Sequence, residues 1–116
     1  MTAASKLSNV VVIQAQLEAY NGQDLDAYCA FFAGDVVVSD LNGAVGVQGL
    51  EAYRAKYDGV FKQFPQNKVE LLNRMVVGST VIDHEKVVRS PGGETFEVIA
   101  IYTLADGKIA RVDFAK

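Results

Sequence analysis

Asp40 is the first residue in the sequence whose setting suggests chemistry. It follows three valines at residues 36–38 and precedes Asn42-Gly43, which is a strong turn signal. A carboxylate beside apolar residues can accept a proton as a general base, because loss of hydration raises the pKa of such a group. The same position also suits an aspartate that stabilises a turn. The local pattern leaves both interpretations open.

Asp83 and Glu85 form a second group of interest, since alternate residues of a strand share one face. If Gly78-Ser79 is a two-residue turn, Arg74 lies opposite Asp83 in the resulting hairpin. This arrangement predicts either an acid/base cluster that works with Asp40 or a structural ion pair between Arg74 and Asp83. The two interpretations are compatible, because an arginine-held carboxylate can also orient a water molecule or a substrate carbonyl.

His84 is the only histidine, and histidine side chains titrate near neutral pH. It alternates with Asp83 and Glu85, which places it on the back of the sheet if the two carboxylates face inward. One histidine, a single cysteine at Cys29 and the absence of a ligand spacing motif predict no metal site and no cofactor. The glycines at residues 46 and 49 lack the lysine of a phosphate-binding loop.

The elements that must position these side chains are three helices followed by four strands. Helical spacing of apolar residues predicts helices at residues 7–20, 25–33 and 50–64, ended by Gly22, Gly34 and Pro65. Short β segments are expected at 36–38 and 45–47, and a four-stranded antiparallel meander at 68–77, 80–89, 94–104 and 108–114. Helices followed by hairpins favour a single α+β domain over residues 1–116, with the helices on one face of a curved sheet.

The expected hairpin registers assign a face to each strand residue. If the turn at residues 90–93 pairs Arg89 with Glu94, then Asp83 faces Ala100 and Glu85 faces Val98. The face that carries Ala100 is the more aromatic one, and we assign it to the helices. A turn one residue longer would reverse the assignment.

The back of the sheet would then expose an apolar patch. Its expected members are Ile82, His84, Ile99 and Ile101. A solvated sheet face normally carries less apolar area than this, so the pattern predicts that a second copy of the chain covers the patch in a homodimer.

Three stretches of the sequence are similar to a known superfamily: NGQDLDAYCAFFAGDVVVSDLNG from Asn21, GLEAYRAKY from Gly49, and IYTLADGKIARVDF from Ile101. The chain resembles the nuclear transport factor 2-like superfamily over nearly its whole length, and within it the SnoaL-like and ketosteroid isomerase branch. The resemblance implies a cone-shaped sheet that wraps around the helices, encloses an apolar pocket and dimerises. This fold hosts isomerases, cyclases, hydrolases, dehydratases and non-catalytic binding domains, so the site residues must decide the function.

The resemblance also assigns individual positions. In ketosteroid isomerases an aspartate moves a proton, while a tyrosine and a protonated aspartic acid hold the developing oxyanion. Asp40 falls on the position of the base, Gln16 on that of the tyrosine and Ala100 on that of the acid. Tyr57 falls on a tyrosine that lies along the pocket. Since both oxyanion donors are replaced, and one donor is worth roughly a hundred- to a thousand-fold in rate, efficient steroid isomerisation is not expected.

We therefore expect a protein that binds a small apolar ligand, with isomerase-like proton transfer on a carbonyl compound, or addition of water, as its reaction. Asp40 and Asp83 are the predicted catalytic residues. The predicted ligand-binding residues are Gln16, Phe32, Tyr57, Arg74, Glu85, Ala100 and Tyr102. The alternative is a non-catalytic ligand-binding or dimerisation module of the same fold.

Composition excludes several other classes of protein. The 116 residues include 11 basic and 14 acidic side chains, a formal charge of −3, so the chain lacks the basic footprint of a nucleic-acid-binding protein. No apolar run has the length of a membrane span, residues 1–9 lack the core of a signal peptide, and a lone cysteine forms no internal disulfide. These features predict a cytoplasmic protein that binds neither nucleic acid nor membrane.

Overall fold

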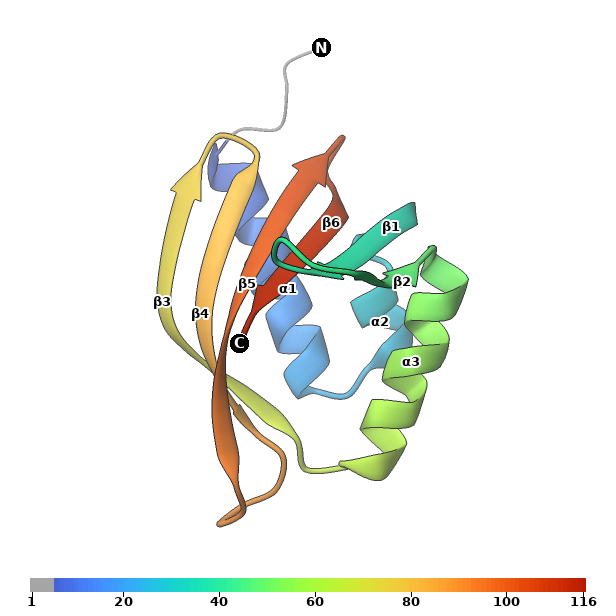
Figure 1. Cartoon of the computed structure of the whole chain (residues 1–116), viewed down its shortest axis with the longest axis vertical. Coiled ribbons are helices and arrows are strands. Elements are labelled where there is room, and N and C mark those ends of the chain that lie inside the picture. Colours follow the sequence, from blue (N-terminus) through green and yellow to red (C-terminus); the bar gives the residue numbers. More distant parts are fainter. Residues whose placement is uncertain (1–5) are drawn as a thin grey trace.

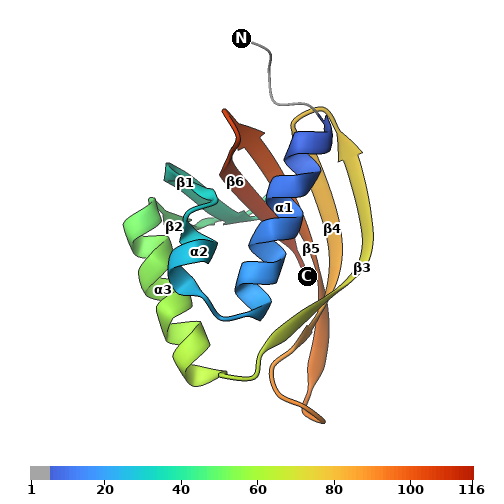
Figure 2. The ribbon, with the colours of Figure 1, turned by 180° about the vertical axis from the view of Figure 1, so that it is seen from behind.

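Six strands form one curved sheet around the helices in the computed structural model, which describes residues 6–116 (Figures 1 and 2). The elements are α1 (Lys6–Asn21), α2 (Leu25–Cys29), β1 (Phe32–Asp40), β2 (Val45–Gln48), α3 (Leu50–Gln63), β3 (Lys68–Val77), β4 (Thr80–Val88), β5 (Thr95–Ala105) and β6 (Lys108–Ala115). The strand order is β2-β1-β6-β5-β4-β3, in which β1 and β6 are parallel and the other neighbours antiparallel. The helices pack inside the curve, so the predicted α+β cone is confirmed.

The helices divide the concave face of the sheet between them. α1 packs against β3 and β4, whereas α3 packs against β1 and β2, with α2 between the two longer helices (Figure 2). None of the described helices has the length and apolar character needed to cross a membrane.

The second helix is shorter than the sequence predicts. Asp24 caps it as expected, since its carboxylate accepts a hydrogen bond from the backbone N–H of Ala27 at 3.1 Å. The prediction that it continues to Gly34 is wrong, because α2 ends at Cys29 and both Phe32 and Gly34 belong to β1. Phe32 pairs with Ile109 of β6, so a partner strand far along the chain overrides the local helical spacing.

The meander follows the expected strands to within one residue at each end. Asp83 lies opposite Arg74 on one side and Ala100 on the other, and Glu85 lies opposite Val98, as predicted. The sequence did not reveal a bulge at Leu72, where the β3–β4 register shifts by one residue.

Aromatic side chains from the helices and β1 fill one end of the cone. Their rings contact one another at centroid distances between 4.5 and 6.3 Å. The hydroxyl groups of Tyr28 and Tyr53 are hydrogen-bonded at 2.5 Å, which satisfies both polar groups in an otherwise apolar core. The members are Tyr20, Tyr28, Phe32, Tyr53, Tyr57 and Phe61.

Candidate functional site

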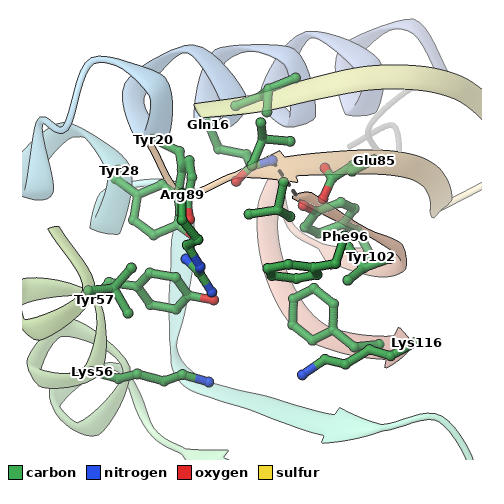
Figure 3. Close-up of a pocket in the computed structure, with 16 residues that line it drawn as sticks. Gln16, Tyr20, Tyr28, Lys56, Tyr57, Glu85, Arg89, Phe96, Tyr102 and Lys116 are labelled. Carbon is green, nitrogen blue, oxygen red and sulfur yellow. Dashed lines mark hydrogen bonds between the residues drawn. The ribbon is translucent and has the colours of Figure 1, made fainter. Parts of the chain in front are cut away.

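A cavity of about 150 Å³ lies between α1, α3 and the concave face of the sheet (Figure 3). Most of its wall is aliphatic or aromatic, and a few polar side chains interrupt it. The lining residues are Gln16, Leu17, Tyr20, Tyr28, Lys56, Tyr57, Val60, Val69, Glu85, Val87, Arg89, Phe96, Val98, Tyr102, Phe114 and Lys116. An apolar cavity with a few convergent polar groups has the character of a small-molecule site.

Glu85 is the acidic group of the cavity wall. It is 5% exposed, and β4 directs it inward because the strand alternates between buried and half-buried residues. Burial, followed by the negative charge of Asp83, raises the pKa of Glu85 to about 8; the charge of Arg74 and a hydrogen bond with Tyr102 oppose the shift. At neutral pH Glu85 is therefore a carboxylic acid and can donate a hydrogen bond.

A chain of hydrogen bonds leads from α1 to Glu85. Gln16, which is 2% exposed, donates from Nε2 to the hydroxyl oxygen of Tyr102 at 3.2 Å (Figure 3). Because the hydroxyl oxygen accepts this bond, the hydroxyl hydrogen is left for the bond with Glu85. The Tyr102 hydroxyl thus favours the charged form of Glu85 and opposes part of the effect of burial on the pKa of Glu85.

Asp83 shares the inward face of β4 with Glu85 and forms a buried ion pair. Arg74 donates from Nε and Nη2 to the two carboxylate oxygens of Asp83 at 2.7 and 2.9 Å, and from Nη1 to Oε1 of Gln14 at 2.9 Å. Asp83 is fully buried and Arg74 is 14% exposed. Neither residue lines the cavity. This geometry fits the structural ion pair, and the pair acts on the cavity through the electrostatic field at Glu85.

Asp40 lies at the end of β1 and its side chain is exposed. Its backbone forms the expected turn, with the N–H of Gly43 donating to the carbonyl oxygen of Asp40 at 2.9 Å. It does not line the main cavity but borders a separate recess that shares Phe114 and Lys116 with it. Asp40 therefore flanks the cavity, and its exposed side chain lacks the burial expected of a base.

The other predicted site residues divide into two groups. Gln16, Tyr57 and Tyr102 line the cavity together with Glu85. Phe32 and Ala100 are buried in the core behind the wall, 3% and 0% exposed.

The residues predicted for the dimer contact lie on the back of the sheet. Ile99 is 39% exposed, and Ile82 and Ile101 are partly exposed beside it. His84 is close to Glu97, with Nε2 and Oε1 separated by 2.5 Å.

The sequence interpretation missed three basic residues of the cavity lining: Lys56, Arg89 and Lys116. Arg89 could have been found, because it continues the alternation Asp83, Glu85, Val87 along the same face. Lys56 also carries a signal, since it lies three residues after the buried Tyr53 on α3. Within the described residues no group of three or more histidine, cysteine or carboxylate side chains is placed to hold a metal ion.

The fold is a curved sheet wrapped around helices, with a cavity between the helices and the concave face of the sheet. These features define a class of cone-shaped proteins whose cavity has the character of a small-molecule site. Residues 13–112 match the family model for the SnoaL-like domain, and the chain belongs to this family. The comparison with curated proteins returned no match.

Solved structures with the same fold cover nearly the whole chain. An uncharacterised protein from Novosphingobium aromaticivorans, described as having a cystatin fold, is 32% identical with a TM-score of 0.86, and the alignment covers 93% of this chain and 97% of that one. A candidate polyketide cyclase from Sinorhizobium meliloti is 30% identical with a TM-score of 0.76, covering 90% and 93%. A candidate ketosteroid isomerase from Kribbella flavida is 14% identical with a TM-score of 0.80, covering 97% and 78%, and shows the fold alone.

Proposed function

We propose that the chain binds a small, largely apolar carbonyl compound in the cavity, with Glu85 donating a hydrogen bond to the carbonyl oxygen. One observation carries the proposal: a carboxyl group that is 5% exposed, and whose pKa is raised by that burial, lies at the wall of a cavity lined mainly by aliphatic and aromatic side chains. An unpaired buried donor is costly, so the site favours ligands that present an acceptor to it. The name of the similar cyclase structure refers to polyketides, which agrees with this ligand class.

The size of the cavity limits the ligand. Pockets for drug-sized ligands span roughly 300–1,000 Å³, whereas this cavity holds about 150 Å³. An engineered apolar cavity of about that volume binds benzene. A compound with one ring therefore suits the cavity, and a four-ring steroid exceeds it.

The reaction that this arrangement suits best is isomerase-like proton transfer next to the carbonyl. A neutral acid at the carbonyl oxygen stabilises the charge that develops when an adjacent carbon loses its proton. Glu85 would thus supply the donor that Gln16 and Ala100 do not. Asp40 is the candidate base: it would take the proton from the carbon between the carbonyl and a double bond and return it at the far end of the shifted double bond. Since the reacting carbon is bonded directly to the carbonyl carbon that faces Glu85, Asp40 can act as the base only if its side chain turns from the neighbouring recess into the cavity.

The binding experiment uses cyclohexanone, an unreactive ketone with one ring, titrated into the protein and followed by NMR. Glu85→Leu removes the donor and should weaken binding about tenfold, whereas Glu85→Gln keeps an N–H donor and should weaken it less. Glu94→Gln, in the exposed turn between β4 and β5, is the matched control and should change nothing. Absence of binding by the parent protein at millimolar ketone would overturn the proposal.

The catalytic part is tested with cyclohex-3-enone, whose conversion to the conjugated ketone is followed by ultraviolet absorbance. Turnover that is lost in Asp40→Asn supports a base at this position. Turnover that is unchanged in Asp40→Asn rules out this base while leaving ligand binding in place.

A non-catalytic dimerisation module is the second candidate, and the back of the sheet favours it. Met75, Ile82 and Ile101 occupy paired positions across β3, β4 and β5, and Met75 is 63% exposed. We propose that a second copy of the chain covers this surface. A protein that dimerises but binds no ketone would match this candidate.

A further inference from the structure

Three basic side chains gather at the open end of the cavity. Lys56 and Lys116 are exposed and Arg89 is partly exposed, while Gln16 and Glu85 are buried. The exposed lining residues mark the mouth of the cavity. The mouth therefore carries basic side chains, whereas the buried end carries an amide and a carboxyl group. Figure 3 shows the ammonium groups of both lysines on the side away from Gln16 and Glu85.

These cations lack ion-pair partners among the described residues. The ion pairs of residues 8–116 involve Arg54, Lys62, Arg74, His84 and Arg111. Glu85 does not balance the charge at the mouth, because it is protonated at neutral pH. Three cations against the single carboxylate of Asp40, which also acts on Lys56, leave the mouth electropositive although the whole chain carries a formal charge of −3.

The basic groups also act on one another. Desolvation and then the charge of Lys116 lower the pKa of Lys56, with a further lowering from Arg89 and an opposing effect of Asp40. Like charges repel each other, and an anion between them would relieve the repulsion.

Arg89 is oriented by its neighbours. Its guanidinium lies over the rings of Phe64 and Phe96, at 4.9 and 5.2 Å from their centroids. Nη1 donates to Oδ1 of Asn67 at 3.4 Å. A guanidinium fixed by stacking presents its planar donor edge with little further loss of side-chain freedom, and that edge matches a carboxylate.

We infer that the ligand is a small organic anion, with a carbonyl group at its inner end facing Glu85, one ring between the apolar walls, and a carboxylate at the mouth among Lys56, Arg89 and Lys116. This inference rests on the proposed function and adds the anionic group. Oppositely charged ends of ligand and site also fix which end enters first, since a carboxylate at the buried end would lose its hydration without a cation to replace it.

The test compares two compounds that differ only in charge. 4-Acetylbenzoate carries a carboxylate opposite its acetyl group, and 4-acetylbenzamide carries a neutral amide there. Titrations followed by NMR at pH 6.5 keep Glu85 protonated. Glu85→Leu should weaken both compounds, which reports that both occupy the cavity. At low ionic strength the parent protein should bind the benzoate about tenfold more tightly than the benzamide, and about 0.5 M salt should reduce that preference.

Replacement of one basic residue shows whether the preference for 4-acetylbenzoate arises at the mouth of the cavity. Lys56→Gln should remove most of the benzoate preference and leave the benzamide affinity unchanged. Lys62→Gln removes the same charge from the same helix, at a residue paired with Asp58 outside the cavity, and should keep the preference. Arg89→Gln is the second variant, and thermal unfolding of each variant checks that it folds.

The possible results distinguish failure of the anionic-ligand inference from failure of the proposed carbonyl-binding function. Benzamide binding that depends on Glu85, with benzoate no tighter, overturns the anionic ligand and leaves the carbonyl-binding function standing. A benzoate preference that Lys62→Gln reduces as much as Lys56→Gln also overturns it, because net charge alone would then explain the preference. Binding of neither compound overturns both.

Discussion

Replacement of Glu85 by glutamine should stabilise the protein at neutral pH. Glutamine is close in size to glutamic acid and keeps a hydrogen-bond donor at the cavity wall. It removes a carboxyl group whose ionisation the folded state opposes, since burial and the charge of Asp83 raise the pKa of Glu85 to about 8. The substitution therefore changes the pH dependence of unfolding rather than the packing.

The sign and size of the effect follow from proton linkage. Below the ordinary pKa of 4.5 both folded and unfolded chains carry the proton, so Glu85 costs nothing. Between 4.5 and about 8 the unfolded chain ionises while the folded one does not, and the free energy of unfolding falls as the pH rises. One pH unit in this window is worth about 1.4 kcal/mol, so the cost at pH 7 approaches about 3 kcal/mol. Water that enters the cavity relaxes part of it, and we expect a gain of about 1–3 kcal/mol in Glu85→Gln.

Urea unfolding at pH 5, 6, 7 and 8 measures this gain. The difference between Glu85→Gln and the parent should be small at pH 5, grow steadily to pH 7 and level off near pH 8. Glu94→Gln, in an exposed turn, should track the parent throughout. A difference for Glu85→Gln that is the same at every pH would refute the assignment of a protonated Glu85.

Three other predictions concern the ion pair, the turn and the back of the sheet. Arg74→Met leaves the fully buried Asp83 without its cation and should lower the free energy of unfolding by about 3–5 kcal/mol; a loss below about 1 kcal/mol in urea unfolding would contradict the buried pair. Asp40→Asn should shift stability by no more than about 0.5 kcal/mol, because Asp40 is exposed, and a thermal-unfolding gain of about 1 kcal/mol would instead indicate a desolvated carboxylate. Sedimentation at micromolar concentration should give twice the mass of one chain, and Ile99→Lys should give a single chain; a monomeric parent would show that the back of the sheet is not the contact.

The strands and the face that each residue takes could be derived from the sequence because both depend on local rules. Two-residue turns fix the register of a hairpin, and the period of two then carries that register along the strand. For this reason the pairing of Arg74 with Asp83 followed from Gly78-Ser79, and the inward position of Glu85 followed from the turn at residues 90–93 together with the more aromatic face of the next strand. The same alternation leads on to Arg89.

Contacts between distant segments decided the rest. Parallel pairing with β6 drew Phe32 into β1 and set Asp40 beside Phe114, outside the cavity. Packing of α1 against the sheet brought Gln16 to Tyr102 and removed water from Glu85, and it is this burial that turns an ordinary carboxylate into a neutral acid. The sequence determined which side chains face inward, whereas their protonation and their neighbours required the tertiary structure, because desolvation depends on every element that closes over a group.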